Sequence, residues 1–392
     1  MDYYTRARAL EHELIENRRF FHKSAEVGLH MPEATAYITQ KLTEYGLSPQ
    51  MCGEGVIATI GQEGKVILLR ADMDALPMPE ESGLEFACPA GNRAHCCGHD
   101  LHAAMLLTAA KMLKENEAQL DGTVKLMFQP AEETFEGAAN MIAHGALENP
   151  RPDVAMAFHV NSGKVLPGTF VYDTSGEAVL FSMDGFRITV HGRGAHGAFP
   201  HMGVDPINIG VHIHLALQEL IAREIAPTHA CVLTVGQFTA GSAPNIIPET
   251  ATLRGTIRTD NADARALLVR RVREVAEKTA EVYGGTATVE MTSGIPALLC
   301  DTTLSAEMAN YIRELPIPDL ASHSGASTTA SEDFSLISDQ IPSTYIYLTA
   351  GFQDERGTAP AHNPKVQFNE DVLPIGAACM AHCASQWLKN HK

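Results

Sequence analysis

The chain has 392 residues, more than a single hydrophobic core usually organises, so two domains are expected. Its formal net charge of −18 comes from 29 basic and 47 acidic side chains, and no basic stretch stands out, which argues against nucleic-acid binding. No apolar run reaches the roughly 18 residues of a membrane span, and the N-terminus lacks the apolar segment of a secretory signal. Eight scattered cysteines without a disulfide-like spacing indicate reduced thiols, so we expect a cytoplasmic protein.

Helical and strand patterns alternate over the first part of the chain. Helical spacing predicts helices at 34–44 and 102–113, the second with Asp100 as its N-cap. Continuous apolar runs at 66–70, 124–128 and 154–158 predict strands that are buried on both faces. Strands separated by helices predict an α/β domain with a mainly parallel sheet.

The middle of the chain follows a different pattern. The predicted order within residues 183–293 is β-α-β-β-α-β, which is typical of a ferredoxin-like α+β domain. The α/β pattern then resumes with a helix near 302–315, a strand at 345–348 and a final helix at about 371–389. We therefore expect a discontinuous domain of residues 1–182 and 294–392, interrupted by an inserted domain of residues 183–293.

Polar side chains suited to metal binding or proton transfer occur at or just after predicted strand ends, where open α/β sheets form ligand crevices. Cys97 and His99 could converge on one cation if the loop turns at Gly98. A closed structural zinc site would need about two more Cys or His residues, and no second local cluster is evident.

Two adjacent carboxylates, Glu132 and Glu133, follow the predicted strand at 124–128. They repel each other unless a cation or a proton separates their roles. One could bind a metal while the other takes a proton from a metal-bound water, although two solvated acids in a turn remain the simpler alternative.

Two histidines and two aspartates could complete such a site. His159 ends the predicted strand at 154–158, where a lone histidine is more often a core residue than a ligand. His362 lies in a loop between prolines, where a histidine is usually just part of the surface. Asp72 and Asp74 follow the strand at 66–70 and could orient imidazoles from behind.

Taken together and in chain order, the motifs closely resemble those of one enzyme family. The chain resembles the metal-dependent N-acyl-amino-acid amidohydrolases of the aminoacylase and carboxypeptidase clan, nearest to the branch of the hippurate hydrolases and auxin-conjugate hydrolases. The resemblance spans nearly the whole chain. Its motifs are Arg70-Ala-Asp-Met-Asp-Ala-Leu-Pro77, His95-Cys-Cys-Gly-His-Asp100, Phe128-Gln-Pro-Ala-Glu-Glu133, Phe158-His-Val160, Gly194-Ala-His-Gly-Ala-Phe-Pro-His201, Ala243-Pro-Asn-Ile-Ile-Pro248 and Ser331-Glu-Asp-Phe-Ser335.

The resemblance implies a site for two divalent metal ions, such as Zn, Mn, Ni or Co. A thiolate stands where other branches of the clan use an aspartate. Glu132 matches the general base, and Asp74 matches the carboxylate that supports a ligand. The residues that match metal ligands are Cys97, His99, Glu133, His159 and His362.

The resemblance also assigns roles in the inserted domain, which would act as a lid and form a homodimer. His196 matches a histidine that binds or polarises the scissile carbonyl, and in relatives it can reach the active site of the partner subunit. Asn245 and Arg258 match groups that hold the substrate carboxylate, although an arginine on a strand is often only part of a surface ion pair.

The implied activity is hydrolysis of N-acyl-L-amino acids to a carboxylic acid and a free amino acid. A dipeptidase or carboxypeptidase would use the same metal site and is the enzymatic alternative. A metal-stabilised binding protein without catalysis is the other alternative, and the presence of both Glu132 and His196 argues against it.

Overall fold

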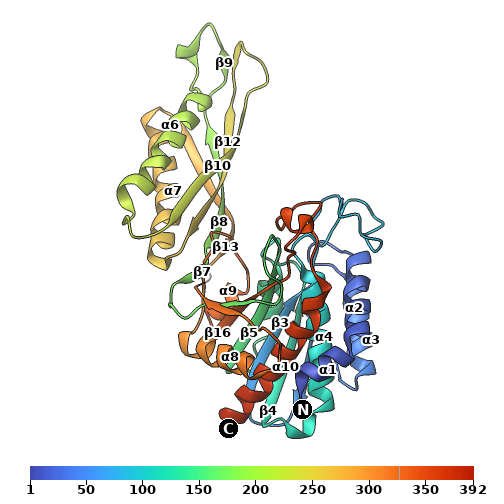
Figure 1. Ribbon diagram of the computed structural model, residues 1–392. Helices are drawn as coiled ribbons and strands as arrows, with labels where there is room; N and C mark the ends of the chain where they lie inside the picture. Colours follow the sequence, from blue (N-terminus) through green and yellow to red (C-terminus); the bar gives the residue numbers. More distant parts are fainter. Residues whose placement is uncertain (326) are drawn as a thin grey trace. The chain divides into compact units, whose positions relative to one another are not determined.

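The computed structural model describes residues 1–325 and 327–392. The chain folds into two compact units, both drawn in Figure 1. Unit 1 comprises residues 1–177, 299–325 and 333–392, and unit 2 comprises residues 178–298 and 327–332. Each unit has its own cluster of buried apolar side chains. Unit 1 is therefore discontinuous in sequence.

Unit 1 contains an eight-stranded mixed sheet with the order β1-β2-β4-β3-β5-β16-β6-β15. Its four central strands, β4, β3, β5 and β16, are parallel to one another, which confirms the predicted α/β fold with a mainly parallel sheet. The pairs β1–β2, β2–β4 and β16–β6 are antiparallel. The strands are β1 (Gln50–Cys52), β2 (Gly55–Gly61), β3 (Lys65–Asp72), β4 (Gly122–Gln129), β5 (Val154–Asn161), β6 (Phe170–Tyr172), β15 (Ser322–Ser324) and β16 (Ser343–Thr349).

The central strands are continuous apolar runs because both faces of the sheet are covered. Every residue of β3 after Lys65 is buried, and so is every residue of β16. The carboxyl ends of these parallel strands meet at one edge of the sheet, so the loops that follow them come together there.

Helices pack against this sheet and against one another. Helix α4 contacts α10, and both lie against β3 and β4, whereas α5 and α9 contact each other and lie against β4 and β16, respectively. Helix α4 is buried along most of its length because its sequence is apolar on every side. The helices are α1 (Tyr3–Ala9), α2 (Glu11–Lys23), α3 (Pro32–Glu44), α4 (His99–Glu115), α5 (Gly137–Ala143), α8 (Thr302–Glu314), α9 (Ser335–Ser338) and α10 (Leu373–Asn390), with 3-10 turns at Glu117–Gln119, Glu355–Thr358 and Glu370–Val372.

Unit 2 contains a four-stranded antiparallel sheet with the order β10-β12-β8-β13. Helices α6 and α7 contact each other and pack on β8 and β12, with Ile188, Ile213, Leu253 and Val272 buried in the shared core. The main elements follow the order β-α-β-β-α-β along the chain. They are β8 (Ser182–His191), α6 (Pro206–Glu219), β10 (Cys231–Ala240), β12 (Thr250–Thr259), α7 (Ala262–Val282) and β13 (Thr286–Ile295); shorter elements are β7 (Ala178–Leu180), β9 (Ala195–His196), a 3-10 turn (Pro200–Met202), a π-helical turn (Leu220–Glu224), β11 (Ile246–Ile247) and β14 (Leu298–Leu299).

The prediction that Asp100 is the N-cap of α4 is wrong. The helix begins at His99, and its N-cap is Gly98, whose φ of 93° is left-handed. Asp100 is fully buried in the first turn, where its carboxylate accepts a hydrogen bond from Arg18 Nε at 2.9 Å and contacts His22 Nδ1 at 2.8 Å. The carboxylate of Asp100 therefore binds buried cationic side chains and does not cap the helix terminus.

Membrane-spanning helices are absent from residues 1–325 and 327–392. Each helix there is either too short or too polar to cross a bilayer.

Candidate metal centre

Seven of the predicted site residues lie in unit 1, at the edge where its parallel strands end. Because the carboxyl ends of β3, β4 and β5 are neighbours in the sheet, segments that are far apart in the sequence converge there. The donor atoms of several of these residues lie within 4.8 Å of one another. The seven residues are Asp74, Cys97, His99, Glu132, Glu133, His159 and His362.

Cys97 belongs to two groups of potential metal ligands. It forms one group with His99 and His159, and a second group with Glu133 and His362. Cys97 would therefore be able to supply its thiolate to a cation held by either group.

The turn at Gly98 brings Cys97 and His99 against strand β5. Its left-handed φ of 93° is a conformation that side chains rarely adopt, and a Cβ atom there would lie 2.3 Å from Val160 Cγ2. Only glycine permits this close approach. As a result, Cys97 Sγ lies 3.5 Å from Nε2 of His159, which precedes Val160 on β5.

Asp74 holds the turn that carries the two glutamates. Its Oδ1 and Oδ2 accept hydrogen bonds from the backbone N–H groups of Glu132 and Glu133, each at 3.1 Å. Ala131 has a φ of 53°, which tightens this turn immediately before the glutamates. Burial raises the pKa of Asp74 despite the nearby His99.

Hydrogen bonds on one ring nitrogen orient the other nitrogen of each buried histidine. His99 Nδ1 lies 3.3 Å from Asp74 Oδ1, and His159 Nδ1 lies 2.8 Å from the carbonyl oxygen of Val160. In both rings Nε2 is thereby left to face the cluster, as metal-binding histidines require. Burial lowers the pKa of His159 well below its ordinary value, so this ring stays neutral and keeps its lone pair.

His99 and His362 are influenced by the acidic groups around them. Burial alone would lower the pKa of His99, but the negative charges of Asp72 and Cys97 raise it well above its ordinary value. Close contacts with Cys97 and then with Glu133 raise the pKa of His362 to about 10. Without a metal ion, protons therefore occupy these two donors at neutral pH.

His362 reaches the cluster through a strained loop. Its φ of 62° is left-handed, and its backbone N–H donates to the carbonyl oxygen of Cys96 at 2.9 Å. Its Nε2 then lies 3.4 Å from Oε1 of Glu133. A non-glycine residue in this conformation costs about 1–3 kcal/mol and is typical of functional sites.

The spacing of the donors fits metal ions. His99 Nε2 and Glu133 Oε1 are buried, lack a hydrogen-bond partner among the described residues, and lie 4.0 Å apart. Two ligands of a tetrahedral zinc ion, with bond lengths of about 2.0–2.3 Å, are separated by about 3.3–3.6 Å. The 3.5 Å between Cys97 Sγ and His159 Nε2 and the 3.4 Å between His362 Nε2 and Glu133 Oε1 match this separation.

A buried polar network that was not predicted from the sequence lies behind the cluster. Arg70, which is 1% exposed, donates to Asp72 at 2.6 Å and to Asp333 at 3.1 Å, and His102 Nδ1 lies 2.5 Å from Asp72. The missed signal was the spacing of His99 and His102, because residues three apart lie on one face of a helix.

Unit 2 carries the other three predicted site residues. His196 on β9 is exposed and pairs with Ile246 of β11, and the N–H of Gly197 donates to the carbonyl oxygen of Asn245 at 2.8 Å, so His196 and Asn245 are neighbours. Arg258 is not with them, because it lies near the end of β12 whereas Asn245 precedes the start of that strand. Its Nη1 donates to Ser331 Oγ at 2.7 Å.

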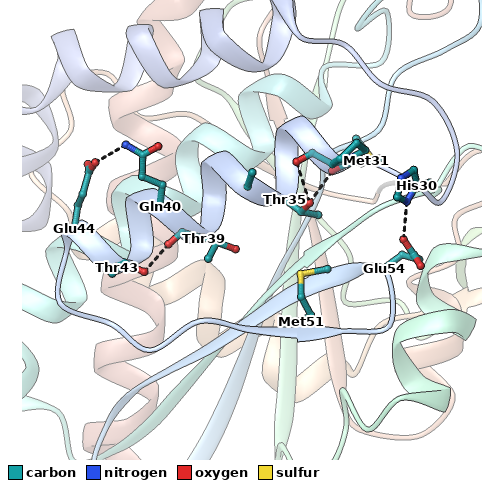
Figure 2. Close-up of a pocket in the computed structure, with 11 residues that line it drawn as sticks. His30, Met31, Thr35, Thr39, Gln40, Thr43, Glu44, Met51 and Glu54 are labelled. Carbon is teal, nitrogen blue, oxygen red and sulfur yellow. Dashed lines mark hydrogen bonds and ion pairs between the residues drawn. The ribbon is translucent and has the colours of Figure 1, made fainter.

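A groove in unit 1 is separate from this cluster. It has a volume of about 620 Å³ and lies along α3, beside Met51 of β1 (Figure 2). Thr35 and Thr43, which line it, donate their hydroxyl groups to the carbonyl oxygens of Met31 and Thr39 (Figure 2). None of the predicted site residues lines this groove.

Comparison with known proteins gives consistent matches over most of the chain. The sequence description of Peptidase family M20/M25/M40 matches residues 68–386. The chain is 35% identical over 371 residues to an N-acetyl-L-cysteine deacetylase of Bacillus subtilis (strain 168), covering 93% of this chain and 85% of the relative. It is 36% identical over 384 residues to the IAA-amino acid hydrolase ILR1-like 2 of Arabidopsis thaliana, covering 96% and 85%.

A solved structure supports the same relationship. A Bacillus subtilis protein, described as a dinuclear metal binding peptidase from the M20 family, superimposes with a TM-score of 0.81. It is 28% identical and the match covers 97% of this chain and 99% of that chain.

Proposed function

The chain belongs to Peptidase family M20/M25/M40 and is a hydrolase acting on amide bonds, and on this premise we propose that it cleaves N-acyl-L-amino acids with the help of two divalent metal ions. The products would be a carboxylic acid and a free amino acid. The observation that carries the proposal is the cluster of five metal-type donors beside Glu132.

We propose that Cys97, His99, Glu133, His159 and His362 hold the two ions. Imidazole, carboxylate and thiolate donors suit Zn, Mn, Ni or Co, and the thiolate favours the softer of these. Bound ions of this kind polarise a carbonyl group and lower the pKa of an attacking water.

Glu132 is the proposed general base. It accepts a proton from the attacking water at a carboxylate oxygen while the water oxygen bonds to the acyl carbon. It then donates this proton to the nitrogen of the leaving amine as the carbon–nitrogen bond breaks. Adjacent Glu133 would hold metal, so the two glutamates have separate roles despite their mutual repulsion.

His196, Asn245 and Arg258 are the proposed substrate-binding residues. His196 would donate a hydrogen bond to the oxygen of the scissile carbonyl, where negative charge develops. Asn245 and Arg258 would hold the carboxylate of the amino acid. Mixed dimers of the His196→Ala and Glu132→Gln variants test in which subunit His196 acts. They should be active only if His196 acts in the site of the partner subunit.

The substrate class is proposed from the relatives. The names of both sequence relatives specify a modified amino acid, N-acetyl-L-cysteine in one and an IAA-amino acid in the other. The donor cluster would equally support a dipeptidase or carboxypeptidase. Assaying N-acetyl- and N-benzoyl-amino acids beside dipeptides that have a free amino group separates these alternatives, and no amine release from any substrate would favour a non-catalytic binding protein.

The Glu132→Gln variant is the direct test of the mechanism. We expect it to bind both metal ions but to lose about 10²–10⁴-fold in kcat, because the amide cannot accept the proton. Metal content and the rate of amine release are measured on the same sample. Glu136→Gln, an exposed glutamate of the same turn, is the matched control and should retain full activity. Turnover of Glu132→Gln at the rate of the unmodified protein would contradict the assignment.

We also propose a homodimer formed through unit 2. The exposed side chains of Ile207, Val211 and Leu215 are four residues apart and so lie on one face of α6. Phe238 of β10 packs against α6 at Gly210, where a Cβ atom would lie 2.6 Å from the phenyl ring. Since β10 is at the edge of its sheet, an apolar helix face adjoins an open strand edge, which suits a second copy of the chain.

A further inference from the structure

His102 is a fully buried histidine of α4 with no role in the proposed reaction. Its Nε2 accepts a hydrogen bond from the backbone N–H of Val160 at 2.8 Å, and its Nδ1 lies 2.5 Å from Asp72 Oδ1. Because a backbone N–H can only donate, Nε2 carries no proton and the ring proton is on Nδ1, which donates to Asp72. Both nitrogens are therefore occupied, so His102 is not a metal ligand, although it lies in a group with Asp72 and His99.

The N–H of Val160 is accessible to His102 because strand β5 is longer than its pairing with β3. The β3–β5 register ends at Arg70 and Ala157, whereas β5 continues to Asn161. His102 thus supplies the hydrogen-bond acceptor on the side of β5 that β3 no longer covers.

Val160 is also the backbone contact that orients His159. The carbonyl oxygen of Val160 accepts the Nδ1 proton of His159 at 2.8 Å, and Val160 Cγ2 abuts Gly98. The ring centroids of His102 and His159 are 4.6 Å apart. The hydrogen bond to the N–H of Val160 therefore restrains the backbone of this residue. The carbonyl oxygen of the same residue is held with it, and this oxygen orients His159 so that Nε2 faces Cys97.

Asp72 is itself held by a buried network. Arg70 donates to Asp72 Oδ2, and also to Asp333 Oδ1 and Gln129 Oε1. Asp333 accepts further hydrogen bonds from Gln129 Nε2 at 2.7 Å and from the backbone N–H of Ala138 at 2.9 Å. With one oxygen of Asp72 directed at Arg70, the other is left to accept from His102.

We propose that His102 is a positioning residue for the metal centre, which acts as a neutral, Nδ1-protonated imidazole that couples the Arg70–Asp72–Asp333 network to the backbone of Val160 and so orients His159. This inference rests on the proposed function, because it requires His159 to bind a metal ion. Partners behind a ligand typically change metal affinity about 10–100-fold when they are removed.

Two substitutions separate the hydrogen bonds of His102. His102→Gln can place an amide oxygen near the former Nε2 and keep the bond from Val160, whereas His102→Asn can only replace Nδ1 and keep the bond to Asp72. We expect His102→Asn to lose about 10–100-fold in affinity for one of two Mn²⁺ ions, measured by chelator competition, and His102→Gln to stay within about threefold of the unmodified protein. His382→Gln, at a nearly buried histidine of α10, is the matched control and should leave Mn²⁺ affinity unchanged.

The tautomer of His102 gives a readout that needs no metal and no substrate. In metal-free protein labelled with ¹⁵N-histidine, the resonances that disappear in His102→Gln should show a protonated Nδ1 and an unprotonated Nε2. A protonated Nε2, either alone or together with Nδ1, would overturn the inference even if a variant failed to fold.

The outcomes distinguish this inference from the proposed function. If the unmodified protein binds two Mn²⁺ ions and hydrolyses its substrate while His102→Asn binds Mn²⁺ equally well, the positioning role is wrong and the function stands. If the unmodified protein binds no metal ion, both are wrong.

Discussion

At the scale of single residues, the proposed metal centre depends on the thiol of Cys97 and on the backbone conformation of Gly98. Cys97 belongs to both groups of donors, whereas burial raises the pKa of its neighbour Cys96 to about 12, so Cys96 stays a neutral thiol at neutral pH. Gly98 is required by both its φ and the close approach of Val160. The chemistry of Cys97 therefore depends on the backbone of the following residue.

Gly98→Ala should damage the metal centre as well as the fold. The left-handed φ and the 2.3 Å approach to Val160 Cγ2 together should lower the free energy of unfolding by about 2–4 kcal/mol, with weaker binding of Mn²⁺. Gly83→Ala is the matched control, since Gly83 has a φ of 74° but no atom within 4 Å of the added Cβ, and should cost only about 1 kcal/mol. Urea denaturation measures both, and equal losses would contradict the steric argument.

Metal binding should release protons. The pKa of His362 is raised to about 10 and that of His99 is also raised, so both rings are protonated at pH 7 before a metal ion arrives. Each must lose its proton to become a ligand, so we expect release of about two protons and an apparent affinity that rises between pH 6 and pH 9. Calorimetric titration with Mn²⁺ in buffers of different ionisation enthalpy counts the protons. A binding heat that is the same in every buffer would contradict this, and His362→Asn should lower the count by about one.

At the scale of elements, helix α4 connects the fold to the site. Its N-terminus carries His99 and is anchored to α2 by the buried contacts of Asp100 with Arg18 and His22. Burial alone would raise the pKa of Asp100, but Arg18 and His22 hold it well below its ordinary value. The other ring nitrogen of His22 contacts Glu80 at 2.9 Å, so the loop before Cys97 is tied to the same network.

Asp100→Asn should destabilise the protein by about 3 kcal/mol, because it leaves Arg18 and His22 buried without their shared carboxylate. Because the pKa of Asp100 is lowered in the folded state, its contribution is complete above the unfolded value near 4 and is lost as the pH falls below it. The stability difference between variant and unmodified protein should therefore narrow below about pH 4. Thermal denaturation from pH 7 to pH 3 measures this.

Glu115→Gln is the matched control at the other end of α4. Glu115 pairs with Arg6 at 2.6 Å, but both side chains are about one-third exposed, so the loss should be less than about 1 kcal/mol. A loss as large as that of Asp100→Asn would show that burial does not decide the strength of these pairs.

At the scale of the whole molecule, the two units divide the proposed work. Unit 1 supplies every proposed metal ligand and the proposed base, whereas unit 2 supplies His196, Asn245 and Arg258. The apolar face of α6 and the edge of β10 belong to unit 2 as well. Assembly through this surface would join two copies without using the elements that hold the metal centre.

Val211→Glu should convert a dimer into a monomer, because it places a charge in the centre of the apolar face of α6. Light scattering after size-exclusion chromatography should give a mass near 42.3 kDa for this variant and about twice that mass for the unmodified protein. Val282→Glu, at a valine of α7 that is 78% exposed and lies outside this face, is the matched control and should remain dimeric. A Val211→Glu variant that stays dimeric would place the interface elsewhere.

The sequence by itself determined the local elements and the chemical types of the site residues. Continuous apolar runs predicted the central strands, because both faces of a covered parallel sheet exclude water. The positions of Glu133 and His159 near strand ends followed from this, because parallel strands end at one edge. Cys97 lies instead in the loop before α4.

The tertiary structure alone decided which polar groups meet. Asp100 and His102 both lie in the first turns of α4, yet one pairs with cations from α2 and the other with Asp72 and Val160. No local pattern encodes such partners, because the cost of burying a charge is offset only by groups that folding brings from distant segments. The donor residues were therefore predicted from the sequence together with its family resemblance, but the network that holds them in place was not.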